Sequence, residues 1–194
     1  MAQYTKLLEH EIQEIADQYE LKLTDTVPIE GGAANSSYLL STRPDKYILT
    51  IFESSPTFVA QMSQVLLLLA EHEFPAPRIQ PLANGSLLTA YQGKPIFLKP
   101  YITGQVIKDI DDDQLSQLGA ALASLHEIPA PDYLPDKHMY VTETYPMVME
   151  TGTDKTYMDW LRQRYEFLIQ AIPANLPVGL THGDLFYDNV LFED

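Results

Sequence analysis

The chain has 194 residues, 45% of them hydrophobic and 20% charged, a composition that supports a sizeable folded core and excludes a disordered or membrane-embedded chain. Its 12 lysine and arginine residues face 27 aspartate and glutamate residues, and the net charge of −15 disfavours binding to nucleic acid or to anionic lipid. It has no cysteine, which excludes disulfides and thiolate metal sites.

The longest apolar run, Val65 to Ala70, is too short to cross a membrane, and the N-terminus lacks the basic-then-apolar pattern of a signal peptide. We therefore expect a cytoplasmic protein that associates with neither membranes nor nucleic acids. The same negative charge favours a cationic or zwitterionic small-molecule substrate.

The first third of the sequence predicts a helix followed by a strand, a turn and a second strand. Apolar residues recur at helical spacing within 5–19, and strands are expected at 24–30 and 38–41. Gly31-Gly32-Ala33-Ala34-Asn35-Ser36-Ser37 joins these strands as a tight turn. Its small residues allow backbone N–H groups to approach an anion closely, although an ordinary hairpin loop has the same composition.

The next segment alternates strands with one helix. A third strand is expected at 46–53, and an amphipathic helix runs from Pro56 to about His72, before the Pro75-Ala76-Pro77 stop. Further strands are expected at 79–82, 87–91 and 96–101, the last two joined as a hairpin through Gln92-Gly93-Lys94-Pro95.

The second half is predicted to be mainly helical. Residues 99–105 contain a proline and a glycine and suit a linker, and a helix is expected from Asp112 to His126. Residues 129–155 are proline-rich and read as irregular, and a further helix runs from Lys155 to about Ile172. The residues of this helix that we expect to be buried are Met158, Leu161, Tyr165, Leu168 and Ile169.

The most informative stretch is Thr181-His182-Gly183-Asp184-Leu185-Phe186-Tyr187-Asp188-Asn189-Val190-Leu191-Phe192. It places Asn189 five residues after Asp184, just before an apolar strand-like run. A kinase catalytic loop has this spacing because a carboxylate must orient the attacking hydroxyl while a nearby amide oxygen holds a magnesium ion on the phosphates. The alternative is a turn in which the Asp and Asn cap the backbone.

On these residues, the segment resembles the catalytic loop of the aminoglycoside and choline-kinase-like phosphotransferases, and it is most similar to the bacterial homoserine kinases of that superfamily. The resemblance covers nearly the whole chain. It implies an α+β, protein-kinase-like fold with two lobes. Residues 1–101 would form an N-lobe with an antiparallel sheet, and residues 102–194 part of a mainly helical C-lobe that ends just after the catalytic loop.

The resemblance also implies an activity, which is ATP- and Mg²⁺-dependent phosphorylation of the hydroxyl of a small amino alcohol, with homoserine favoured. Choline, ethanolamine or an aminoglycoside are alternative acceptors, and a non-catalytic nucleotide-binding fragment is a further alternative. Asp184 would be the catalytic base and Asn189 the metal ligand. The residues implied in nucleotide binding are Gly31, Gly32, Asn35, Ser36 and Tyr101.

Two departures from the family pattern stand out. The third strand carries Thr50 where kinases place the phosphate-binding lysine, and Lys46 lies four residues away, roughly 13 Å along the strand. The second metal-binding carboxylate is expected 15 to 20 residues after Asn189, past the end at Asp194. We therefore expect a truncated chain that turns over poorly or not at all and that associates into homo-oligomers through exposed lobe surface.

Overall fold

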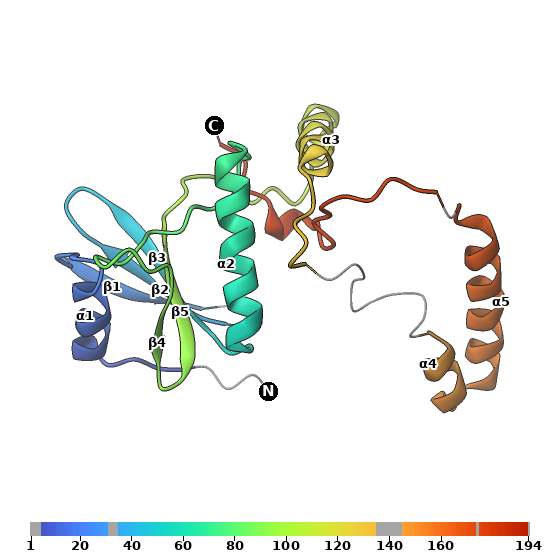
Figure 1. The fold of residues 1–194 in the computed structure, drawn as a ribbon, viewed down its shortest axis with the longest axis horizontal. Coiled ribbons are helices and arrows are strands. Elements are labelled where there is room, and N and C mark those ends of the chain that lie inside the picture. Colours follow the sequence, from blue (N-terminus) through green and yellow to red (C-terminus); the bar gives the residue numbers. More distant parts are fainter. Residues whose placement is uncertain (1–4, 31–34, 135–144, 174, 194) are drawn as a thin grey trace. The chain divides into compact units, whose positions relative to one another are not determined.

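The structure is a computed structural model that describes residues 5–30, 35–134, 145–173 and 175–193. Its described residues form two compact units (Figure 1). The first unit runs up to Ile128 and includes the segment from Thr181 onward, and the second comprises Pro129–Leu180. The catalytic-loop segment therefore belongs to the same unit as the sheet. None of the helices in the described residues is long and apolar enough to span a bilayer.

The first unit is built on a five-stranded antiparallel sheet. Its strands are β1 (Asp25–Ile29), β2 (Asn35–Ser41), β3 (Lys46–Phe52), β4 (Thr89–Tyr91) and β5 (Lys94–Pro100), in the spatial order β1-β2-β3-β5-β4. Every neighbouring pair is antiparallel. This architecture confirms the predicted α+β class and the antiparallel sheet in the first half of the chain.

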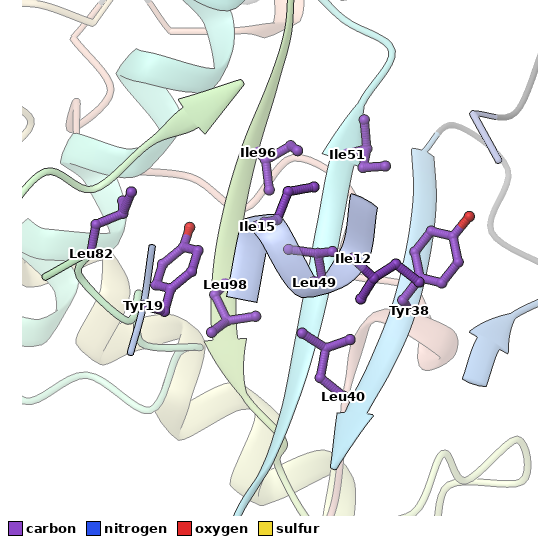
Figure 2. Packing of buried hydrophobic residues seen from close by; sticks show 10 residues of the cluster. All are labelled: Ile12, Ile15, Tyr19, Tyr38, Leu40, Leu49, Ile51, Leu82, Ile96 and Leu98. Atoms are coloured by element: carbon purple, nitrogen blue, oxygen red, sulfur yellow. The ribbon is translucent and has the colours of Figure 1, made fainter. Parts of the chain in front are cut away.

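Each face of this sheet is covered by a different helix. On one face, buried side chains of β2, β3 and β5 pack against α1 (Glu9–Asp17), as Figure 2 shows. On the other face, Phe52 and Phe97 pack against Val59 of α2 (Pro56–Glu71). Because side chains alternate along a strand, neighbouring residues of β3 and β5 contribute to opposite cores, and this alternation decides which residues face α2.

The helices begin where the sequence supplies a capping side chain. Ser55 accepts a hydrogen bond from the Phe58 N–H, 3.3 Å, at the start of α2. At the start of α3 (Asp112–Glu127), Asp111 and Gln114 form a reciprocal capping box, with the Gln114 N–H 2.8 Å from Asp111 Oδ1. The predicted helix at 112–126 is therefore confirmed.

The β4–β5 hairpin is also confirmed, with a shorter turn than expected. Gln92 and Gly93 have φ of 50° and 79°, and positive values at both central residues are typical of a two-residue hairpin turn. Lys94 consequently lies in β5 and pairs with Tyr91.

Three other expectations were wrong. Asn35-Ser36-Ser37 lies in β2 and not in the turn, because all three residues pair with β3. The expected strand at 79–82 is reduced to one bridge, between Gln80 and Leu98. The stretch 129–155 contains a short helix, α4 (Tyr145–Thr151).

The second unit contains α4 and α5 (Lys155–Ala171), and Tyr145 contacts Tyr165 with ring centroids 6.4 Å apart. Met158 is buried as predicted, whereas Leu168 and Ile169 are 44% and 51% exposed. The burial prediction for these two residues was wrong because α4 is the helix packed on α5 among the described residues and it is only seven residues long.

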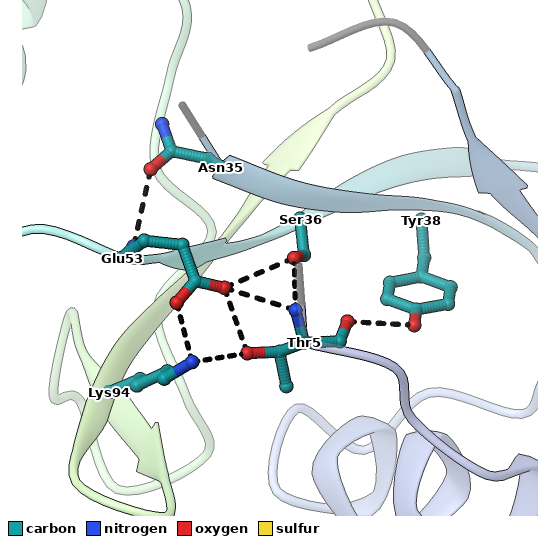
Figure 3. Close-up of polar contacts among 6 residues, drawn as sticks. All are labelled: Thr5, Asn35, Ser36, Tyr38, Glu53 and Lys94. Atoms are coloured by element: carbon teal, nitrogen blue, oxygen red, sulfur yellow. Dashed lines mark hydrogen bonds and ion pairs between the residues drawn. The ribbon is translucent and has the colours of Figure 1, made fainter. Parts of the chain in front are cut away.

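A polar network joins the segment before α1 to β2, to β5 and to Glu53, the residue that follows β3 (Figure 3). The Lys94 ammonium forms an ion pair with Glu53, 2.5 Å, and donates to Thr5 Oγ1, 2.7 Å. Glu53 Oε1 also accepts hydrogen bonds from Thr5 and Ser36. Burial acts to raise the pKa of the Glu53 carboxyl, but the hydrogen bonds from Lys94, Thr5 and Ser36 outweigh it and hold that pKa below its usual range.

Replacing Lys94 with methionine should lower the stability of the sheet by about 1–2 kcal/mol, because Glu53 would keep its partly buried charge without its ammonium partner. In the parent protein, Glu53 contributes stability above its unfolded pKa, and this contribution is lost as pH falls through the lower folded pKa. The Lys94→Met variant should therefore show a weaker acid dependence. Hydrogen exchange of β2 and β3 amides measures both effects, since the single tryptophan, Trp160, lies in the other unit.

The control is Lys22→Met, which removes an exposed lysine outside the network. Equal protection of the sheet amides in Lys94→Met and Lys22→Met would contradict a stabilising role for the ion pair.

Candidate active site

The catalytic-loop segment is a compact turn closed by its own backbone. Gly183 has φ of 76°, a conformation that side chains with a Cβ rarely adopt. The Phe186 N–H then donates to the Asp184 carbonyl, 2.9 Å, and a short 3₁₀ helix, η2 (Tyr187–Asn189), follows. Together these features reverse the chain between Asp184 and Asn189.

This reversal brings the two predicted catalytic side chains into contact. Asn189 Nδ2 donates to the Asp184 carbonyl, 2.8 Å, and to the Asp184 carboxylate Oδ2, 3.2 Å. The Asp184 N–H lies 3.4 Å from His182 Nδ1, which accepts from it. Asp184 and Asn189 are both exposed, so a substrate can reach them.

The end of the loop is attached to the segment that follows β5. Gln105 and Phe192 form an antiparallel bridge, with the Gln105 N–H 2.8 Å from the Phe192 carbonyl and the Phe192 N–H 3.0 Å from the Gln105 carbonyl. A Cβ on Gly104 would lie 3.1 Å from the Leu191 Cβ and from the Phe192 carbonyl oxygen, so a larger residue would crowd this attachment. The end of the 181–192 segment is thus hydrogen-bonded to the segment that follows β5.

The chemistry of this pair suits a magnesium ion. The Asn189 NH₂ group donates to Asp184, and the amide oxygen, which takes no part in these two hydrogen bonds, is a candidate metal ligand. Carboxylate and amide oxygens are the donors that Mg²⁺ prefers, and this ion usually takes one or two side chains and completes its shell with phosphates and water. Among the described residues, no three His, Asp or Glu side chains gather as a metal site.

The predicted nucleotide-binding residues are placed differently. Gly31 and Gly32 lie outside the described residues. Asn35 Oδ1 accepts from the Glu53 N–H, 3.4 Å, and Ser36 is buried in the Glu53 network (Figure 3). Tyr101 is 47% exposed, and its N–H donates to the Lys46 carbonyl, 2.9 Å. The structure therefore brings Asp184 and Asn189 together with one another, and places Asn35, Ser36 and Tyr101 elsewhere in the same unit.

Sequence reasoning missed the ion pair between Glu53 and Lys94. The expected Lys–Glu pair of a kinase joins the third strand to the following helix. The observed pair instead joins Glu53, the residue after β3, to Lys94 of β5. Side chains two residues apart on a strand point to the same face, so this pair lies on the face of Ile51 and Ile96, which α1 covers. The register of β3 with β5, which the sequence alone does not give, was needed to find it.

Comparison with known proteins identifies similar sequences and folds. The profile of the phosphotransferase enzyme family matches residues 25–194. A homoserine kinase of Agrobacterium fabrum is 30% identical over 205 residues, and one of Rhizobium meliloti is 31% identical over 207 residues. Each alignment covers 99% of this chain and 62% of the relative, so the chain spans about three fifths of the length of these proteins.

Solved structures share the fold at low sequence identity. A spectinomycin phosphotransferase in complex with ADP and spectinomycin superimposes with a TM-score of 0.73 at 17% identity, over 96% of this chain and 65% of that one. A thermostable mutant of an aminoglycoside phosphotransferase, in its apo form, gives a TM-score of 0.66 at 13% identity, over 94% of this chain and 67% of that one. The predicted protein-kinase-like fold is thereby confirmed.

Proposed function

The chain belongs to the phosphotransferase enzyme family, and from this premise we propose that the protein transfers the γ-phosphoryl group of ATP to the hydroxyl of a small amino alcohol, with homoserine as the preferred acceptor. The observation that carries the proposal is the contact between Asn189 and the Asp184 carboxylate in an exposed turn. In this proposal, residues 1–101 serve as the nucleotide-binding lobe and residues 102–194 belong to the acceptor lobe.

In the proposed reaction, Asp184 accepts the proton of the acceptor hydroxyl as the oxygen of that hydroxyl attacks the γ-phosphorus. The bond between the γ-phosphorus and the β,γ-bridging oxygen breaks, and ADP leaves. Asn189 holds the Asp184 carboxylate through its NH₂ group, which keeps the base in place for the incoming hydroxyl. A carboxylate alone is a weak base, so positioning supplies much of the rate.

Magnesium fits the oxygen donors of this pair. Asn189 would hold the ion through its amide oxygen, together with the nucleotide phosphates and water. When bound, the ion neutralises charge on the transferring phosphoryl group. At a net charge of −15, such neutralisation favours ATP binding, and the same field favours the ammonium group of an amino alcohol.

The proposal is tested by single-turnover transfer from radiolabelled ATP to a panel of acceptors. Homoserine should be phosphorylated in a Mg²⁺-dependent reaction, faster than choline, ethanolamine or an aminoglycoside. Preferential labelling of one of these other acceptors would overturn the homoserine assignment and keep the reaction class. Binding of Mg²⁺·ATP with no transfer to any acceptor would identify a nucleotide-binding fragment instead.

A further inference from the structure

Lys99 occupies an unusual position for a charged residue, near the end of strand β5, directly after the apolar residues 95–98. Its Cα pairs with Ile48 of β3, and it lies on the same side of β5 as Phe97, two residues earlier. Figure 2 shows Ile96 and Leu98 pointing toward α1, so Lys99 and Phe97 lie on the opposite face, which α2 covers. The ammonium lies 5.7 Å from the centroid of the Phe97 ring.

The surroundings of Lys99 favour an anionic partner. The lysine is only partly accessible, and burial lowers the pKa of its ammonium group. Among the described residues, the ion pairs join Lys94 to Glu53 and Arg162 to Asp159, and no carboxylate lies within ion-pairing distance of the Lys99 ammonium, which lies over the Phe97 ring. A partly desolvated cation beside an aromatic face is poorly compensated, and an anion bound there would restore the lost solvation.

Lys99 also lies close to the position where a kinase needs a phosphate-binding cation. Thr50 stands at that position, and its direct partner on β5 is Phe97. Lys99 is the diagonal neighbour of Thr50 on the same face, and such neighbours are about 7–8 Å apart. The Lys99 ammonium lies over the ring of Phe97, the residue that pairs directly with Thr50.

The other lysines of the sheet are less well placed. Lys94 lies on the opposite face and is engaged by Glu53 and Thr5. Lys46 shares the face of Thr50 but is exposed and lies four residues away, roughly 13 Å along an extended strand. The chain that leaves the Lys99 end of β5 continues to Gln105, which forms the bridge to Phe192 of the 181–192 segment.

We propose that Lys99 binds the phosphate groups of the nucleotide from the neighbouring strand, in place of the lysine that Thr50 replaces. This inference rests on the proposed function, since it assumes that the nucleotide binds on the α2 face of the sheet. Lys99 acts on the phosphates, so its contribution should be absent for a nucleoside that carries none.

The test compares ADP with adenosine by calorimetric titration in the presence of Mg²⁺. Lys99→Met removes the charge and keeps an unbranched apolar side chain over Phe97. This variant should bind ADP about 10- to 100-fold more weakly than the parent protein and adenosine within about twofold of it. Lys99→Arg, which keeps a cation, should recover most of the ADP affinity. Lys46→Met, on the same face, is the matched control and should bind both ligands as the parent protein does.

Each contrary result has a distinct meaning. Unchanged ADP affinity in Lys99→Met, or a parallel loss of ADP and adenosine affinity, would overturn the role of Lys99 and leave the proposed function standing. Failure of the parent protein to bind ADP at all would overturn the proposed function together with this inference.

Discussion

Replacing Asp184 with asparagine is expected to slow phosphoryl transfer by about 10²- to 10⁴-fold, the usual contribution of a general base, while ADP affinity stays within about twofold of the parent value. The amide retains the size of the carboxylate but accepts a proton far less readily. The turn should survive, because the Asp184 carbonyl still accepts from Asn189 and from the Phe186 N–H. Single-turnover transfer to homoserine measures the rate.

Asp188→Asn is the matched control for this experiment. Asp188 lies in η2 between the two functional positions and is exposed, so its replacement changes the charge of the same turn by the same amount. Its transfer rate should remain within a few-fold of the parent rate. Equal rates for Asp184→Asn and the parent protein would show that Asp184 only shapes the turn.

Replacing Asn189 with leucine is expected to weaken Mg²⁺-dependent ADP binding by about 10- to 100-fold, because the variant loses the amide oxygen that would hold the ion. Asn189→Asp separates the two roles of this side chain. It keeps an oxygen for the metal but loses the donors that now reach the Asp184 carbonyl and carboxylate. It should therefore bind Mg²⁺·ADP as the parent protein does but transfer the phosphoryl group more slowly than the parent protein.

Titration of ADP with and without Mg²⁺ separates these outcomes. Binding of ADP without the metal should be similar in the parent protein and in both variants. If Asn189→Leu kept the full Mg²⁺ dependence of the parent protein, the metal-ligand role of Asn189 would be wrong.

The parts of the fold that the sequence predicted well are those set by local chemistry. The capping box of Asp111 with Gln114 and the Gln92-Gly93 turn act within a few residues, and both appear in the structure. The wrong predictions concern pairing and burial. Asn35-Ser36-Ser37 was assigned to the turn on composition, but hydrogen bonding to β3 extends the strand through it.

Burial on α5 was overestimated for a related reason. Leu168 and Ile169 have the spacing of a buried stripe, but a stripe is buried only where another element covers it, and in the described part of its unit α4 is short. The spacing of apolar residues shows which side of a helix is apolar. It does not give the length of the element packed against that face.

The candidate site likewise has one part that the sequence predicted and one part that it did not. The spacing of Asp184 and Asn189 was visible in the sequence because a five-residue turn decides their contact. The environment of Lys99 was not visible, since it depends on the register between β3 and β5, which are more than forty residues apart along the chain. The sequence did offer one sign of it. Lys99 directly follows the apolar residues 95–98 and lies on the same side of the strand as Phe97.

The central claim is that the turn carrying Asp184 and Asn189 lies at the metal-bound nucleotide, with Asn189 holding the metal and Asp184 beside it as the base. Paramagnetic NMR tests this claim most directly. When Mn²⁺·ADP is added, amide signals of residues 183–190 should broaden selectively, whereas diamagnetic Mg²⁺·ADP should only shift them. The Asn189→Leu variant should lose the broadening. Bound Mn²⁺·ADP that broadens signals elsewhere and leaves those of the 183–190 turn sharp would contradict the account.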